Sequence, residues 1–88
     1  MDLLPSKKIP LAQHSLYEME IWLSQIGAKR RKGEKSLWIL IKPLWTAKIR
    51  MEQDGLKVIW SKVEKENQIF CSYGLARRDI EDVILHGP

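Results

Sequence analysis

The sequence predicts an α+β fold: a single small domain with an antiparallel meander sheet of three or four strands and a helix near each end, in the order α-β-β-β-(β)-α. Two observations carry this prediction. Apolar residues recur at helical spacing near both ends of the chain, and the segments between them are rich in β-branched and aromatic residues separated by turn residues. Two amphipathic helices need one core, so we expect both to pack on one face of the sheet.

Length and composition fit one globular domain over residues 1–88. A chain of 88 residues builds one core, and 44% hydrophobic with 30% charged residues is typical of a folded protein. The opening stretch MDLLPSKKIP lacks the pattern of a signal or transit peptide, and we expect residues 1–10 to form a flexible segment. No apolar run approaches the ~18 residues of a membrane-spanning helix, so membrane insertion is not expected.

The cysteine count bears on the compartment and on metal binding. Cys71 is the single cysteine, so no internal disulfide can form and no cysteine spacing for a metal site exists. A reducing, cytoplasmic location is therefore expected, with no cofactor and no metal.

The first helix is predicted in HSLYEMEIWLSQIGA. Ser15 and Glu18 fit a capping box, in which the side chain of each accepts from the backbone N–H of the other. Gly27 is placed to adopt the left-handed conformation that ends a helix. The apolar face expected to be buried consists of Leu16, Met19, Trp22, Leu23 and Ile26.

A positively charged segment follows this helix. The formal net charge of the chain is +4, and the excess lies in its first half. Such a cluster attracts phosphates or acidic protein surfaces, or else it is a solvated connection. We call residues 28–36 the basic loop; its cationic residues are Lys29, Arg30, Arg31, Lys32 and Lys35.

Four strands are expected in SLWILIK, TAKIRMEQ, LKVIWSK and QIFCSY, the last with the least support. Asp54 and Gly55 suit the positive φ angles of a type I′ turn and predict a tight hairpin between the second and third segments. The register that follows pairs Glu52 with Lys57, Met51 with Val58, and Ile49 with Trp60, the last two pairs facing the core.

The direction of Trp38 is left open, because Pro43 predicts a longer or bulged first hairpin loop. A shift of one residue sends either Trp38 and Leu40 or their neighbours into the core. If Trp38 points outward, it joins a binding surface on the open sheet face. The other members of that surface are Leu40, Lys48, Arg50, Lys57 and Ile59.

The last helix is predicted in FCSYGLARRDIEDVILHGP. Its apolar stripe is Ile80, Val83 and Ile84, with Leu75 ahead of it. Carboxylates near its start complement the helix dipole, and Gly87 with Pro88 ends it.

These segments, together with WTAKIRME and LKVIW, resemble a family of small cyanobacterial and chloroplast proteins classed as a domain of unknown function. The resemblance runs from about Pro10 to Pro88. The family ending reads approximately Tyr-Ser-Leu-Ser-Arg-x-Asp, then an apolar helix, then Gly-Pro. Gly74 and Ala76 stand where that pattern has serines, so a weaker helix cap is expected and no serine role carries over. The resemblance implies a fold and a cell type but no activity.

Catalysis is not expected. His14 precedes a helix cap, His86 ends a helix, and Cys71 lies in a predicted strand, so no triad or carboxylate pair is indicated.

Two binding hypotheses remain. The favoured one is a protein interaction module that holds an acidic or apolar partner through the basic loop and the sheet, with Lys48, Arg50 and Trp38 as further candidates. The alternative is RNA binding, because double-stranded RNA-binding domains share the order helix, strands, helix. Arg77 and Arg78 would then contact phosphates from the start of the last helix.

Overall fold

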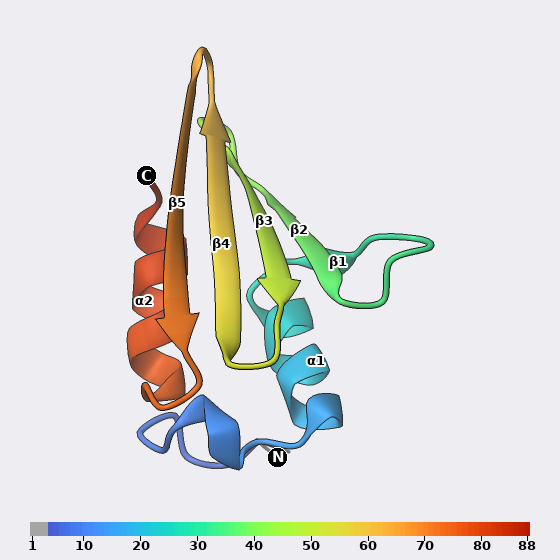
Figure 1. The fold of residues 1–88 in the computed structure, drawn as a ribbon, viewed down its shortest axis with the longest axis vertical. Coiled ribbons are helices and arrows are strands. Elements are labelled where there is room, and N and C mark those ends of the chain that lie inside the picture. Colours follow the sequence, from blue (N-terminus) through green and yellow to red (C-terminus); the bar gives the residue numbers. More distant parts are fainter. Residues whose placement is uncertain (1–3) are drawn as a thin grey trace.

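The computed structural model describes residues 4–88 as a five-stranded antiparallel sheet with two α-helices (Figure 1). The strands lie in the order β1-β2-β3-β4-β5, so each pairs with its neighbour in sequence. The α+β prediction is confirmed, and the uncertain fourth segment is a full strand. The elements are η1 (Leu11–Gln13), α1 (Leu16–Gln25), β1 (Lys29–Arg30), β2 (Leu37–Ile41), β3 (Thr46–Met51), β4 (Gly55–Lys62), β5 (Lys65–Ser72) and α2 (Arg77–His86).

Both helices cover the same face of the sheet, as predicted. The buried cluster joins residues of α1 and α2 to alternate residues of β2, β3 and β4, which therefore point to one side. Figure 1 is viewed from the other side, with the helices behind the strands. In the part of the chain that the structure describes, no helix covers the opposite face of the sheet. Within residues 4–88, no helix is long and apolar enough to cross a membrane.

The capping box predicted for α1 is present. Ser15 Oγ accepts from the N–H of Glu18 at 3.1 Å, and Glu18 Oε1 accepts from the N–H of Ser15 at 2.7 Å. Gly27 has a φ of 101°, as expected for a residue that ends a helix. The predicted apolar face holds at Trp22 and Leu23, but Leu16 is 60% exposed because it lies in the first turn, outside the core.

The predicted β3–β4 register is wrong by two residues. Met51 pairs with Leu56 and the N–H of Glu52 donates to the carbonyl of Gly55 at 2.9 Å, so the two-residue turn is Gln53–Asp54. Neither turn residue adopts a positive φ, which excludes type I′. Gly55 serves another purpose: a Cβ there would lie 2.3 Å from the carbonyl oxygen of Cys71 on β5. Because the shift is two residues, the predicted faces are unchanged.

Trp38 points into the core. It pairs with Ile49, shares the helix-covered face with Leu40, and is 5% exposed. The binding surface that we predicted for an outward-pointing Trp38 therefore includes neither Trp38 nor Leu40.

Residues 4–10 pack against the start of α2. Leu4 belongs to the buried cluster, Pro10 forms a bridge with Ala76, and the N–H groups of Arg77 and Arg78 donate to the carbonyls of Ile9 and Lys7. We expected a flexible segment over residues 1–10. Residues 1–3 lie outside the described residues, and the rest of that segment is held by backbone bonds that sequence periodicity does not indicate.

The buried stripe and the C-terminal end of α2 follow the prediction, but the position of Leu75 before the helix does not. Ile80 and Ile84 are fully buried, and Gly87 has a φ of 86°. Leu75 is 45% exposed, because it lies in the turn before the helix rather than in the stripe.

Candidate functional site

The open face of the sheet carries basic and apolar side chains in alternation. The strand register places three rows across it: Lys29–Ile39–Lys48–Ile59–Gln68, Leu37–Arg50–Lys57–Phe70 and Ile41–Thr46–Ser61–Glu66. These rows lie on one side because their members alternate with the core residues along each strand. We call the following seven residues the basic face: Lys29, Ile39, Lys48, Arg50, Lys57, Ile59 and Phe70.

Two like charges lie directly opposite each other in the middle of this face. Arg50 on β3 pairs with Lys57 on β4, and like charges in such a pair destabilise a sheet. Among residues 4–88, the carboxylate that forms an ion pair with one of them belongs to Glu34 of the basic loop, whose Oε2 lies 3.8 Å from Arg50 Nη2. Within residues 4–88, Lys48 and Lys57 form no ion pair. Glu66 in the third row is opposite Ser61 and not opposite Arg50 or Lys57, so the middle of the face is short of negative charge.

The basic loop is attached to the edge of the basic face. Leu37 donates its N–H to the carbonyl of Glu34 at 3.2 Å and accepts from the N–H of Arg31 at 2.8 Å. Leu37 is only 2% exposed although it lies on the open side, outside the core cluster. Glu34 Oε1 also lies 3.8 Å from Arg31 Nε, so one carboxylate links the loop to Arg50. Lys32 and Lys35 are exposed beside it.

The basic loop does not act as one cluster. Its first two cations, Lys29 and Arg30, form β1, which the sequence did not predict, and alternation sends Lys29 to the open face and Arg30 to the helix side. There Arg30 Nη1 lies 3.3 Å from Glu20 Oε2 on α1. Of the loop cations, Lys29 therefore adds to the basic face, whereas Arg30 belongs to a different surface.

Three predicted site residues lie elsewhere. Trp38 is buried on the helix side. Arg77 is 7% exposed and donates to the carbonyl of Pro5 at 3.2 Å, so it cannot contact a phosphate backbone. Arg78 is exposed, with Nε 3.8 Å from Asp79 Oδ1, at the start of α2. That helix lies behind β5, at the opposite edge of the sheet from β1 (Figure 1).

Two members of the basic face were missed from the sequence. Ile39 and Phe70 are opposite Lys48 and Lys57 respectively, and Phe70 is 52% exposed. The available signal was strand alternation: once Cys71 is assigned to the core, Phe70 must face outward.

Nucleophilic or metal chemistry finds little support in the described residues. Burial raises the pKa of the Cys71 thiol, which favours the unreactive protonated form. Burial and the nearby Glu52 raise the pKa of Tyr73, whose hydroxyl donates to the carbonyl of Glu52 at 2.6 Å. No group of three or more potential metal ligands occurs within residues 4–88. What this arrangement can do is attract and hold an anionic surface.

Fold and site together define a small two-layer α+β domain with one helix-covered face and one exposed face rich in cations. Residues 26–87 match the family described as protein of unknown function (DUF3143), and the chain belongs to this family. The match spans the sheet and α2 and begins where α1 ends. No curated protein and no solved structure gives a significant match.

Proposed function

We propose that this protein is a non-catalytic interaction module, and that its basic face and basic loop bind an acidic segment of a protein partner. The observation that carries the proposal is the Arg50–Lys57 pair in the middle of an uncovered sheet face. Such a pair weakens the free domain, and a carboxylate placed between the two side chains would convert repulsion into attraction.

A polypeptide fits the face better than a nucleic acid. The basic face alternates Lys and Arg with Ile39, Ile59 and Phe70, which suits a segment that carries both carboxylates and apolar side chains. Sheets that bind single-stranded RNA stack two or three bases on aromatic side chains, and this face has Phe70 alone. The analogy with double-stranded RNA-binding domains relied on Arg77 and Arg78; the structure buries Arg77 and leaves Arg78 exposed beside Asp79.

The proposed setting is the reducing interior of a cell, where the buried Cys71 stays a free thiol. The cytoplasm, and cyanobacteria or chloroplasts as the source, remain predictions from the sequence.

The proposal can be tested with defined ligands and a matched pair of variants. The probe is a short peptide of glutamate and serine with one central phenylalanine, compared with a single-stranded polyuridylate of equal charge. The test variant is Lys48→Glu with Lys57→Glu. The control is Lys62→Glu with Lys65→Glu, which makes the same charge change at the β4–β5 tip, where both lysines line a recess with Trp60 and Pro88 on the helix side.

We expect the test variant to lose affinity for the peptide by about tenfold or more, because two attractions become repulsions. The control should lose much less. Equal losses of peptide affinity in both variants would show that binding depends on the net charge of the domain and not on the basic face. Binding of the RNA instead, with affinity that falls log-linearly with salt, would favour the alternative function.

A further inference from the structure

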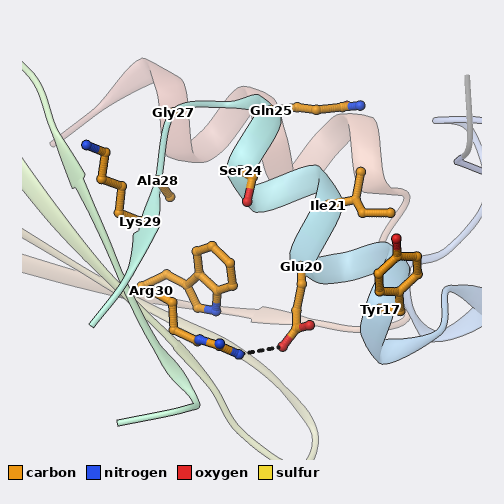
Figure 2. A pocket seen from close by; sticks show the side chains of 10 residues that line it. Tyr17, Glu20, Ile21, Ser24, Gln25, Gly27, Ala28, Lys29 and Arg30 are labelled. Carbon is orange, nitrogen blue, oxygen red and sulfur yellow. Dashed lines mark hydrogen bonds and ion pairs between the residues drawn. The ribbon is translucent and has the colours of Figure 1, made fainter. Parts of the chain in front are cut away.

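A groove of about 840 Å³ separates α1 from β1 on the helix side of the sheet. One face of the helix lines it from Tyr17 to Gln25, and residues 27–30 with Trp38 line the other side. Figure 2 shows Glu20 and Arg30 pointing toward each other across this groove, joined by their ion pair. The volume lies in the range of sites that bind small ligands, so the groove has ample room for one aromatic side chain.

The groove contains an unused hydrogen-bond donor. Trp38 is 5% exposed, and its Nε1–H has no partner within the described residues. Buried polar groups almost always have a partner, and an unpaired one costs free energy. The two other buried indoles show the usual pattern: Trp22 donates to Glu81 at 2.8 Å and Trp60 to the carbonyl of Ile84 at 3.4 Å.

The strand beside the groove has a free backbone edge. Within residues 4–88, β1 pairs only with β2, and the N–H of Arg31 donates to the carbonyl of Leu37. Because hydrogen-bonded and non-bonded pairs alternate in an antiparallel ladder, Arg30 and Trp38 form a non-bonded pair. The N–H and C=O of Arg30 therefore point away from β2, and its side chain lies close to that of Trp38.

We propose that an extended acidic segment of the partner pairs with this edge at Arg30 and inserts one aromatic side chain into the groove. An oxygen of the segment accepts from Trp38 Nε1, and Lys29 and Arg30 attract its carboxylates. The N–H is closed to water in the free chain, so a side chain must move to admit the segment. Arg30 moves at the lowest cost, because it is half exposed and held to Glu20 by a single 3.3 Å contact.

Charge and shape both select this occupant. The groove is lined by Tyr17, Ile21 and Ala28, so it favours an apolar group. The carboxylate of Glu20 also lines it, so the carboxylates of the segment lie outside the groove, beside the cationic loop. Adding a strand to an exposed edge is a common mode of peptide recognition, in which backbone bonds give affinity and a pocket gives specificity. This inference rests on the proposed function, since it assumes an acidic polypeptide partner.

The test compares two peptides that differ at one position. Both consist of glutamate and serine, one with a central phenylalanine and the other with alanine there. We expect the phenylalanine peptide to bind the wild type about tenfold tighter or more, as for burial of an aromatic side chain. Ser24→Trp should obstruct the groove and remove this preference, whereas Ser24→Ala at the same exposed position should retain it.

A second readout follows the donor itself. The Trp38 Nε1–H signal in a ¹H–¹⁵N spectrum, assigned by its loss in Trp38→Phe, should shift downfield when the phenylalanine peptide binds. The same variant should weaken that peptide by about tenfold, the loss of one hydrogen bond to a charged acceptor.

The outcomes separate this inference from the proposed function. Equal affinity of both peptides, with both still weakened by Lys48→Glu with Lys57→Glu, overturns the inference and leaves the proposed function intact. A preference for phenylalanine that survives Ser24→Trp also overturns it. If neither peptide binds the wild type, both proposals fall.

Discussion

At the scale of single residues, this molecule tolerates a local conflict on its open face. Arg50 and Lys57 are cross-strand neighbours of the same charge, and Glu34 lies close to only one of them. Gly55, two residues before Lys57, contrasts with this pair because it fits its surroundings closely. Only glycine lets β4 and β5 approach as closely as they do at that point. The close approach at Gly55 involves β4 and β5, whereas the charge repulsion between Arg50 and Lys57 lies on the solvent-exposed face.

We predict that Lys57→Glu stabilises the free domain. The substitution replaces repulsion opposite Arg50 by attraction, for an expected gain of about 0.2–1 kcal/mol in the free energy of unfolding. Lys57→Gln, which removes only the repulsion, should gain less. Urea unfolding measures both, and the same variants should bind the acidic peptide more weakly. A loss of stability in both variants would show that Lys57 is not under electrostatic strain.

At the scale of elements, the two helices begin by different means. α1 starts with the side-chain capping box of Ser15 and Glu18. α2 follows Ala76, whose side chain provides no cap. The N–H groups of Arg77 and Arg78 instead donate to the carbonyls of Ile9 and Lys7. The backbone carbonyls of residues 7–9 therefore supply acceptors for the first N–H groups of α2, as the Ser15 side chain does for α1.

This difference predicts unequal effects of two opposite substitutions. Ser15→Ala should cost about 1 kcal/mol, because it leaves a helix N–H without a partner. Ala76→Ser should change the free energy of unfolding by less than about 0.5 kcal/mol, because the N–H groups it would cap already have acceptors. Chemical denaturation of the two variants measures this. A large gain from Ala76→Ser would indicate that the backbone bonds from residues 7–9 contribute little.

At the scale of the whole molecule, one core serves both helices and four of the five strands. Cys71 of β5 belongs to this core, and burial raises the pKa of its thiol above the ordinary 9.0. The folded state then keeps a proton that the unfolded state releases. Stability from this source is complete below pH 9.0 and is lost as the pH rises toward the folded-state pKa.

We therefore predict that the free energy of unfolding falls as the pH rises above 9.0. The raised pKa of Tyr73, whose ordinary value is 10.0, extends the fall to higher pH. Cys71→Ala should lower stability at neutral pH but flatten the first part of this decline. Denaturation at a series of pH values measures both, and parallel profiles for the two proteins would contradict the prediction.

The sequence predicted most of the elements but not all the pairings. Periodicity located both helices and four strands, because their apolar patterns are long enough to be distinctive. β1 was missed because two consecutive cations carry no strand pattern. The β3–β4 register was misplaced because Gly55 was assigned to the turn, whereas the contact that requires glycine comes from β5. Such a contact is invisible to local rules.

The candidate site was predicted in part for the same reason. Lys48, Arg50 and Lys57 were placed on the open side correctly, since a two-residue register shift preserves faces. Arg77 was misassigned because its burial depends on residues 4–10, far away in sequence. Trp38 could not be placed, because apolar residues occur at both parities of β2.

The bonds between residues 7–12 and residues 73–78 also bear on how the protein is made. The N–H of Leu11 donates to Leu75, that of Ala12 to Tyr73, and those of Arg77 and Arg78 to Ile9 and Lys7. A ribosome delivers the first partners of these bonds long before the second. The early segment must wait, unpaired, until residues 73–78 have also left the exit tunnel, so these bonds form only after all five strands have been synthesised.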